Sequence, residues 1–505
     1  MMTITFPNHS MLVAAGSLAF GQALWAGEQA VRNAIEFLDP RTIEHTYFLD
    51  RRITPAEKHP GNPVIADCHS AQTVLQDRDG SLRLWYVTRR KIPGYTGSAR
   101  EYTLRYAEST DGVTWTRPEL GLKEFDGTWK NNVLITAHDT DSTGRKLTGQ
   151  GGLVCGNFSI IDRERGPAPH TRGRFTALIN QGNALGLVYS DDGLRWTAYP
   201  ENPVFDASWS DTNNNLVFDP DIGRYVLYYR PHPRVHAGPR HVNRLVARIE
   251  SADLINWDLG SARCVLDTDA RDAPAFSAVK DARGRDRQFY GMLVSRHQDF
   301  YLGLPNLLDE GTGHMDLRLV NSPDGVDWQR EPNETPFVTT TPGAWDCGTI
   351  GFVATGCPIQ VGDDLLFYYG GTNMTHNYKI MNDEKTLKMR LGLATVRRGR
   401  LVGYHAGEAE GELLTRPFLL DKPCLRLNAD AADGEVRAAL LRADGTPIPG
   451  RGKGTCEPLH NDGLDLPLRW RDHGSLNDTV GTRVRLRLYV RNAAVYAIQT
   501  APSED

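Results

Sequence analysis

The sequence predicts an all-β protein: a five-bladed β-propeller with a short helical or extended lead-in before it and a C-terminal β-sandwich after it. Three observations predict this fold class. A short motif recurs four times, five pairs of apolar strands accompany it, and the pattern of strands changes after about Thr415. Internal repeats of this kind are typical of propellers. The expected boundaries are residues 1–58 for the lead-in, 59–412 for the propeller and 413–505 for the sandwich.

The recurring motif is a strand followed by Ser-x-Asp, usually Gly, and a Trp four residues after the Asp. Its four copies are Tyr106–Trp115, Val188–Trp196, Arg248–Trp257 and Val320–Trp328. Asp and Gly favour a tight turn, and the Trp can pack back as the next strand begins. We therefore assign the motif a scaffolding role and no catalytic role.

A pair of strands is expected upstream of each motif copy, and a fifth pair follows the last copy. Each pair reads as an apolar strand, a polar turn and an aromatic strand. The five segments are Ser70–Val87, Asn157–Ile179, Asn214–Arg230, Phe276–Arg296 and Gly351–Gly371. In a propeller, residues just before the first strand and just after the second strand of each blade meet at one mouth, so we expect the active residues there.

The composition of the chain argues against several classes of binding partner. The 505 residues carry a net charge of −5 with no basic block, which argues against nucleic acid as a partner. Seven cysteines are scattered without metal-ligand spacing, so we expect no metal, no cofactor and no disulfide framework. Free thiols favour a cytoplasmic over a secreted location.

The N-terminus leaves two readings open. Met11–Gly27 is apolar like the core of a signal peptide, but Met1–Ser10 contains no Lys or Arg. The apolar stretch is also short for a membrane span. We favour a packed N-terminal helix over a signal peptide and expect no membrane partner, and the oligomeric state stays open.

Several segments resemble the five-bladed glycoside hydrolase superfamily of families 32, 43 and 68, most closely its uncharacterised family-32-like branch. They are Phe37–Glu44, His59–Ile65, Asn131–Asn132, Ser210–Pro220, Trp345–Gly348 and Phe367–Gly371. The resemblance covers about residues 37–410 and implies a carbohydrate substrate and glycosidase chemistry. The nucleophile motif Trp-Met-Asn-Asp-Pro-Asn-Gly, the Arg-Asp-Pro and the Glu-Cys acid motif of family 32 are missing, so the resemblance does not transfer a catalytic set.

The catalytic candidates come from strand position. Glycoside hydrolysis needs two carboxyl groups, one as acid and one as base or nucleophile. Asp67, Asp211 and Asp346 precede the first strands of blades one, three and five, so all three can point into one central well. Which of them is the acid stays open, a loop-borne Glu310 or Glu384 is an alternative acid, and each Asp can instead cap a turn.

The substrate-binding candidates flank the same strands. An Arg can hold a carboxylate or a diol by two bonds, a His or Asn can hydrogen-bond a hydroxyl, and a Trp can stack on a sugar ring. The candidates are His69, Asn157, Asn213, Arg230, Arg296, His297, His376, Trp209 and Trp345. Rim salt bridges and core packing are the alternative roles.

We therefore expect a glycoside hydrolase acting on a terminal or small sugar unit, with fructosyl or arabinosyl furanosides favoured by the resemblance. Two alternatives stay open. One is a glycoside phosphorylase, in which the Arg and His side chains hold phosphate. The other is a propeller that binds glycans without cleaving them.

Overall fold

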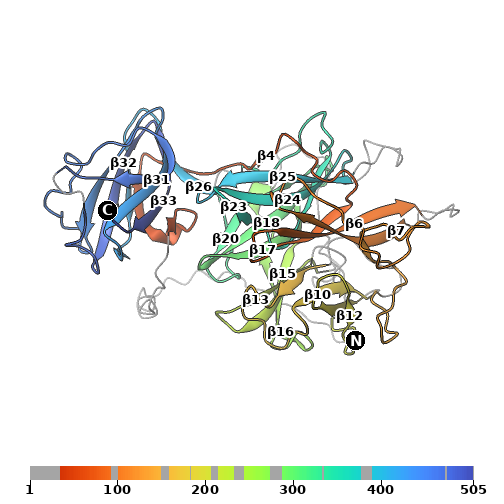
Figure 1. Cartoon of the computed structure of the whole chain (residues 1–505). Coiled ribbons are helices and arrows are strands. Elements are labelled where there is room, and N and C mark those ends of the chain that lie inside the picture. Colours follow the sequence, from red (N-terminus) through yellow and green to blue (C-terminus); the bar gives the residue numbers. More distant parts are fainter. Residues whose placement is uncertain are drawn as a thin grey trace. The chain divides into compact units, whose positions relative to one another are not determined.

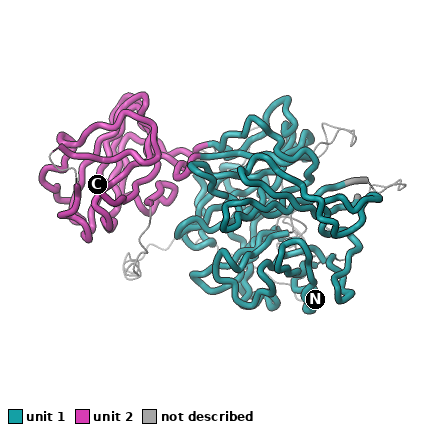
Figure 2. The backbone as a smooth tube through the Cα atoms, viewed as in Figure 1, with its two compact units in different colours: residues 1–6, 55–396 teal, residues 7–54, 397–505 magenta. Residues whose placement is uncertain are grey.

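The computed structural model describes residues 34–91, 100–148, 158–181, 184–205, 214–231, 244–272, 287–331, 335–376, 389–471 and 475–503. The described residues form two compact units, residues 55–396 and residues 34–54 together with 397–503 (Figure 2). The first unit begins at Pro55 rather than at the expected residue 59. The C-terminal part of the second unit begins at Arg397 rather than at the expected residue 413. The reason is strand pairing: β3 (Asp50–Ile53) and β26 (Val402–Ala406) pair with each other inside the second unit.

The all-β prediction is confirmed, since the described residues contain strands and two single-turn 3-10 helices but no α-helix. Residues 1–33, which hold most of the expected N-terminal helix, lie outside the described residues. The part of the lead-in that is described forms β1 (Ile35–Glu36), a strand of the second unit. In the described part of the chain, no helix is long and apolar enough to cross a membrane.

The first unit consists of antiparallel strand groups that follow one another along the chain (Figure 1). Group 1 contains β5 (Ser70–Gln76), β6 (Leu82–Lys91), β7 (Arg100–Ser109) and β8 (Val133–Ile135). Group 2 contains β9 (Ile160–Asp162), β10 (Phe175–Asn180), β11 (Leu185–Ser190) and β12 (Thr197–Ala198). Group 3 contains β13 (Asn215–Asp219), β14 (Arg224–Tyr229), β15 (Val246–Ser251) and β16 (Trp257–Leu266).

Two further groups belong to one ten-stranded sheet. Group 4 contains β17 (Arg287–His297), β18 (Phe300–Asp309), β20 (Val320–Ser322) and β21 (Gln329–Arg330). Group 5 contains β22 (Thr349–Val353), β23 (Ile359–Val361), β24 (Asp364–Thr372), β25 (Met389–Arg397) and, at its outer edge, β4 (Glu57–Lys58). The short β19 (Met315–Leu317) joins them, because it pairs with β18 and, in parallel, with β22.

The two ends of each strand group are distinguished by how the first and second strands are connected. The first strand of a group begins where the second strand ends, as in Ser70 opposite Val87 and Thr349 opposite Thr372. We call this the entrance end. We call the opposite end, where first and second strands are joined by a turn, the hairpin end.

Group 4 differs from the expected pair of strands. Residues 287–297 form one strand, β17, whose partner is β18, a strand that the sequence analysis did not predict. The predicted partner upstream lies largely outside the described residues. β18 was missed because nine of its ten residues are buried, so it lacks the alternation of apolar and polar residues.

Hydrogen bonds between the groups form a closed series. They link group 1 to 2, 2 to 3, 3 to 4, 4 to 5, and 5 back to 1. The bonds are Thr73 Oγ1 to Phe158 O (2.6 Å), Ser159 Oγ to Leu216 O (3.2 Å), Val294 N to Asn215 Oδ1 (2.7 Å), Asn306 Nδ2 to Gly351 O (2.9 Å) and Thr355 N to Gln72 O (2.8 Å). The first strands of these groups therefore surround a common centre.

The Ser-x-Asp motif forms the same turn in all four copies. In the first copy, Ser109 Oγ accepts the Gly112 amide at 2.8 Å, and Asp111 Oδ1 accepts the amides of Val113 and Thr114. These backbone bonds lower the pKa of Asp111 to about 2. The other copies repeat the bonds at Ser190, Ser251 and Ser322.

The glycine carbonyl of the turn accepts a bond from the preceding group. Trp85 Nε1 donates to Gly193 O at 2.8 Å, Tyr228 Oη to Gly325 O at 2.9 Å, and Tyr368 Oη to Gly112 O at 2.7 Å. These bonds join group 1 to 2, 3 to 4, and 5 to 1. The motif is thus a connection between groups at the hairpin end.

The second unit is built from two sheets. One contains β1, β3, β26, β33 (Ala493–Ala501), β29 (Cys424–Asp430) and β31 (Asp462–Leu468). The other contains β2 (Ile43–Tyr47), β27 (Gly411–Thr415), β28 (Phe418–Leu419), β30 (Glu435–Arg442) and β32 (Arg483–Arg491). Alternate residues of both sheets, such as Leu427, Val495, Leu440 and Leu486, share one hydrophobic core.

Candidate functional site

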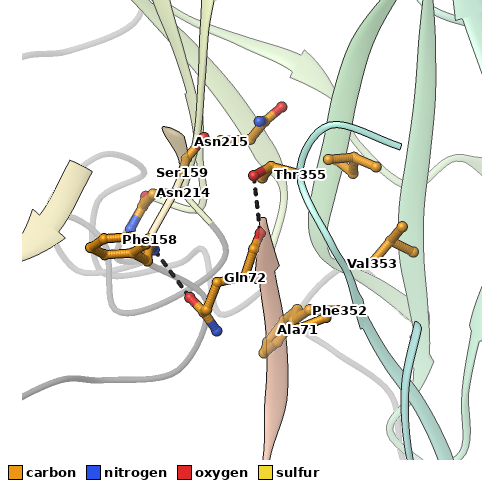
Figure 3. A pocket seen from close by; sticks show the side chains of 10 residues that line it. Ala71, Gln72, Phe158, Ser159, Asn214, Asn215, Phe352, Val353 and Thr355 are labelled. Atoms are coloured by element: carbon orange, nitrogen blue, oxygen red, sulfur yellow. Dashed lines mark hydrogen bonds between the residues drawn. The ribbon is translucent and has the colours of Figure 1, made fainter. Parts of the chain in front are cut away.

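The centre of the first unit is lined by neutral residues of all five groups. Figure 3 shows the small pocket there, in which Gln72 Oε1 accepts the Phe158 amide at 3.0 Å. Its lining consists of Ala71, Gln72, Phe158, Ser159, Asn214, Asn215, Leu293, Phe352, Val353 and Thr355. The amides and hydroxyls of the lining bond within the protein, since Asn215 Oδ1 accepts the Val294 amide and Ser159 Oγ donates to Leu216 O, and no charged side chain lies among them.

Beside this pocket, cationic and aromatic side chains gather around Tyr290 of β17. The guanidinium of Arg230 lies 4.4 Å from the centre of the Tyr290 ring and that of Arg244 lies 5.2 Å from it. The His376 ring is 4.9 Å from the same ring, and Phe352 of the central pocket is 6.0 Å from it. We call Tyr290, Arg230, Arg244 and His376 the Tyr290 cluster.

Three strand groups contribute to the Tyr290 cluster. Arg230 follows β14, Arg244 precedes β15, and His376 follows β24, all at the entrance end. Arg230 is buried, while Tyr290 and His376 are partly exposed. Arg230 and His376 were predicted as substrate-binding residues, and the structure brings them to the same ring.

Glu310, the alternative acid, lies beside this cluster. Its carboxylate forms an ion pair with Arg244, which also donates to Gln288 Oε1 at 2.8 Å. The Glu310 side chain is 23% exposed, so a ligand at the entrance end can reach it. The other alternative acid, Glu384, lies outside the described residues.

His69, at the start of group 1, is buried at the entrance end. Its Nδ1 has no hydrogen-bond partner within the described residues, and its ring contacts that of Tyr102 at 5.2 Å. Burial, together with the charge of Arg89, lowers the pKa of His69 to about 3. The imidazole is therefore neutral near pH 7 and can exchange a hydrogen bond with a ligand hydroxyl.

Asp346 lies at the expected end of group 5, but its carboxylate points away from the centre. Oδ2 accepts bonds from Lys58 Nζ at 2.5 Å and from Tyr369 Oη at 3.0 Å. Lys58 belongs to β4, the outermost strand of the group, so the carboxylate lies over the sheet rather than at its inner edge. Oδ1 is buried and has no partner within the described residues.

Trp345 stacks on Tyr369, with ring centres 5.9 Å apart and an angle of 17° between the planes. The predicted stacking platform is therefore occupied by a neighbouring ring on the same face as Asp346. Burial and the adjacent Asp346 carboxylate raise the pKa of Tyr369, so its hydroxyl stays protonated and donates to Asp346.

Arg296 and His297 require a correction. They lie at the hairpin end, because β17 is the first strand of its group and these residues lead into the turn to β18. Arg296 forms an ion pair with Asp221 in the β13–β14 turn and donates to Tyr301 Oη at 3.2 Å. The His297 ring packs against Phe300 at 5.3 Å. Neither residue is at the end where the other candidates gather.

The remaining predicted residues divide into two sets. Asp67 is exposed just before β5, at the entrance end. The others lie outside the described residues, and they are Asn157, Trp209, Asp211 and Asn213. The described residues contain no group of three or more His, Cys, Asp or Glu side chains that could hold a metal ion, and their six cysteines are free thiols.

Tyr290 and Arg244 were missed by the sequence analysis. The predicted positions lie before first strands and after second strands, whereas Arg244 precedes a third strand. Tyr290 lies inside β17, which was taken for a second strand. A signal was available for Arg244, because the third strand of each group begins at the same end as the first.

Comparisons with known proteins identify no family. No family model matches the sequence, and no curated protein matches it. Solved structures do match, and several of them are described as glycoside hydrolases.

Three of these structures illustrate the likeness. One is a member of the GH130 family of mannoside phosphorylases described as a hydrolase targeting β-1,2 mannosidic linkages in Candida mannan (15% identity, 69% of this chain and 95% of that chain, TM-score 0.44). Another is a thermostable family-43 glycoside hydrolase (12% identity, 67% and 92%, TM-score 0.44). A third is an N-acetylgalactosamine deacetylase from F. plautii (15% identity, 70% and 96%, TM-score 0.39). Likeness at this level does not define the activity of this chain.

Proposed function

We propose that the first unit is a five-bladed β-propeller that cleaves glycosides at its entrance end, and that the second unit is a β-sandwich. The closed series of hydrogen bonds between groups 1 to 5 supports the propeller. The core shared by the two sheets supports the sandwich. In this arrangement, residues 55–396 form the catalytic domain, and residues 397–503 form the sandwich together with residues 34–54.

The observation that carries the proposal is the Tyr290 cluster beside a neutral polar centre. A sugar has an apolar ring face and many hydroxyls, so it needs an aromatic surface together with directional donors and acceptors. Tyr290 and the neighbouring Phe352 are partly exposed aromatic rings, while Arg230 and His376, packed against Tyr290, offer donors.

The acid and the base are proposed among the carboxyl groups of the entrance end. Asp67 is exposed there, Glu310 lies beside the Tyr290 cluster, and Asp211 precedes β13 in the sequence. One group would protonate the leaving oxygen and another would activate water or attack the sugar. Asp346 stays a candidate through its buried Oδ1, with Lys58 and Tyr369 fixing the other oxygen.

The substrate is proposed to be a terminal or small sugar unit. Fructosyl and arabinosyl furanosides are the first to test, with mannosides and pyranosides for comparison. The screen measures release of the leaving group and of the sugar from each substrate. Binding without turnover of any substrate would favour a glycan-binding propeller instead.

Two arginine variants test the position of the site. Arg230→Ala removes a guanidinium stacked on Tyr290 at the entrance end, and we expect kcat/KM to fall by about a hundredfold, as for loss of a charged hydrogen bond to substrate. Arg296→Ala is the matched control, because it removes a guanidinium 5.3 Å from the Tyr301 ring at the hairpin end. Equal losses in both variants would remove the site from the entrance end.

Phosphorolysis is the second candidate function, and one observation favours it. Two arginines and a histidine converge on Tyr290, which is a charge pattern suited to an oxyanion. Cleavage rates measured with and without inorganic phosphate, together with detection of a sugar phosphate, separate phosphorolysis from hydrolysis. A rate independent of phosphate excludes this candidate.

A further inference from the structure

The second unit contains a groove that its own fold creates. Tyr404 of β26, Val495 of β33 and Ala429 of β29 belong to the hydrophobic core of this unit. The residues next to them along each strand therefore face outward. Across the sheet, His405 pairs with Ala494, and Ala494 pairs with Asp430. The short Ala494 side chain therefore lies between two longer polar ones, and the surface is hollowed there.

The groove is bounded by side chains of several strands and turns. Its lining consists of Arg52, His405, Ala406, Gly407, Asp430, Asp433, Asn492, Ala493, Ala494 and Tyr496. Tyr496 is buried beneath its surface, and the backbone of Gly403 lies against the Tyr496 ring, where a Cβ would meet Cε1 at 2.5 Å. Asn492 and Gly407 are held together by a bond from the Asn492 amide to the Gly407 carbonyl at 2.8 Å.

The chemistry of the lining selects a class of ligand. Asp430 and Asp433 are acceptors, Arg52 is a donor, and Asn492 is both. Burial and the charge of Arg52 lower the pKa of His405, so its ring is neutral near pH 7 and can donate or accept. Mixed donors and acceptors at close spacing suit the adjacent hydroxyls of a sugar.

Charged ligands fit the groove less well. An anion would face the carboxylates of Asp430 and Asp433, and Arg52 is already paired with Asp50 at 2.7 Å. A metal ion needs several close ligands, and the described residues contain no group of three or more His, Cys, Asp or Glu side chains that could hold one. The lining therefore favours an uncharged, hydroxyl-rich ligand.

A second, independent feature lies on the connection from β2 of one sheet to β3 of the other, the strand that carries Arg52. Tyr47 and Phe48, at the turn between β2 and β3, are 64% and 66% exposed, and their rings pack edge to face at 4.4 Å. Phe48 has a φ of 49°, a conformation that costs a bulky residue about 1–3 kcal/mol and is often retained at binding sites. Tyr47 and Phe48 therefore expose two large aromatic rings to solvent at a strained turn. We call them the Tyr47–Phe48 platform, and it is suited to stacking on sugar faces.

We propose that this groove, together with the Tyr47–Phe48 platform, binds an uncharged saccharide chain, separately from the site in the first unit. The groove would hold the hydroxyls of one sugar unit and the platform would stack on a neighbouring unit of the chain. The binding itself does not depend on the proposed catalytic function.

Affinity gel electrophoresis of the full chain tests the proposal. The gels contain inulin, levan, arabinan, mannan or xylan, with polygalacturonate as the charged comparison. We expect at least one uncharged polymer to slow the protein. Asp430→Asn should weaken this binding by about tenfold, the effect of losing one charged hydrogen bond. The matched control Asp444→Asn, at the other end of β30, should change nothing.

A second variant guards against a folding artefact. Phe48→Gly removes one ring of the platform and suits the φ of 49°, so the melting temperature should stay or rise while polymer binding falls. The proposal is overturned if no uncharged polymer slows the protein, if only polygalacturonate does, or if Asp430→Asn and Phe48→Gly bind as the parent chain does.

Two measurements separate this proposal from the proposed function. If Arg230→Ala loses polymer binding while Asp430→Asn keeps it, the polymer binds to the first unit and the groove is excluded. Turnover of small aryl glycosides by the parent chain reports on the first unit alone. Absence of turnover with polymer binding that depends on Asp430 would refute the glycosidase and leave the groove standing.

Discussion

The two ends of the first unit carry different polar groups. At the hairpin end, charges are matched within the protein: Arg174 bonds to Asp77 at 2.5 Å and to Asp162 at 3.0 Å, joining groups 1 and 2. At the entrance end, His69 Nδ1 and Asp346 Oδ1 are buried without a partner among the described residues. Buried polar atoms are normally bonded, and such exceptions also occur at the hairpin end, as at Nε1 of Trp115, Trp196 and Trp257. At either end, an atom of this kind indicates a place where water or a ligand completes the bonding.

This comparison separates the residues expected to stabilise the first unit from those expected to act on a substrate. The repeated Ser-x-Asp turns and the Arg–Asp pairs occupy the hairpin end, where they connect one group to the next. The entrance end also has connections between groups, such as Asn306 Nδ2 to Gly351 O and Arg244 to Gln288 Oε1, and it carries the candidate carboxyl groups as well. Substitutions at the hairpin end should therefore change the free energy of unfolding, and those at the entrance end should change activity.

The largest expected effect contrasts two aspartates on either side of β5. Asp67→Asn removes an exposed carboxylate at the entrance end, and we expect turnover to fall by about a thousandfold, as for loss of a general acid or base, with an unchanged melting temperature. Asp77→Asn weakens the bonds from Arg83 and Arg174, so it should lower the free energy of unfolding by about 1–2 kcal/mol.

Kinetics and thermal melting on the same two preparations decide the comparison. Asp77→Asn should keep the parent kcat. If Asp67→Asn stayed fully active, Asp67 would leave the catalytic set, and Asp211 and Glu310 would be the next carboxyl groups to test.

A smaller effect concerns the pH dependence of stability. The pKa of His69 is about 3 in the folded chain against 6.5 as the ordinary value, so the unfolded chain takes up the proton first as the pH falls. This contribution is complete above pH 6.5 and is lost progressively down to about pH 3. Between pH 7 and pH 4, the free energy of unfolding should fall by about 3 kcal/mol through His69. The aspartates of the hairpin end behave differently, since Asp111 stays ionised down to about pH 2.

Urea unfolding of the parent chain and of His69→Gln between pH 7 and pH 4 measures this difference. The variant should lose less stability on acidification than the parent. Parallel curves for the two proteins would mean that His69 is protonated in the folded chain or reaches water, and the contrast between the two ends would lose one of its supports.

The sequence predicted the parts of this architecture that depend on local pattern. The Ser-x-Asp turns could be predicted because the bonds that shape each turn join residues at most five positions apart, as between Asp111 and Thr114. β18 was missed because a strand buried on both faces has no alternation to detect. That error of one strand placed Arg296 and His297 at the wrong end.

Contacts between distant residues were out of reach for a different reason. Lys58 and Asp346 are 288 residues apart in the chain, and no spacing rule connects them. The Tyr290 cluster draws on three groups in the same way. The sequence could therefore predict which end carries the polar residues, but not which of them share a ring or an ion pair.

The smallest expected effect compares two glycines of turns at the hairpin end. Gly193 has a φ of 77°, and a Cβ there would lie 2.8 Å from Cζ2 of the buried Trp85, which cannot move aside. Gly80 has a φ of 89° with nothing within 4 Å of the added atom. Gly80→Ala should cost about 1 kcal/mol from backbone strain alone, and Gly193→Ala about 2 kcal/mol, because the clash adds to the strain.

Chemical denaturation of both variants measures the difference, and catalytic rates serve as the control. Gly193→Ala also pushes Trp85 from its bond to the Gly193 carbonyl, so it weakens the connection between groups 1 and 2. If the connection at the hairpin end only stabilises the closed series of strand groups, kcat is unchanged at temperatures well below the melting temperature. A fall in kcat larger than the fall in folded fraction would show that the entrance end depends on the hairpin end, and the division drawn between them would have to be given up.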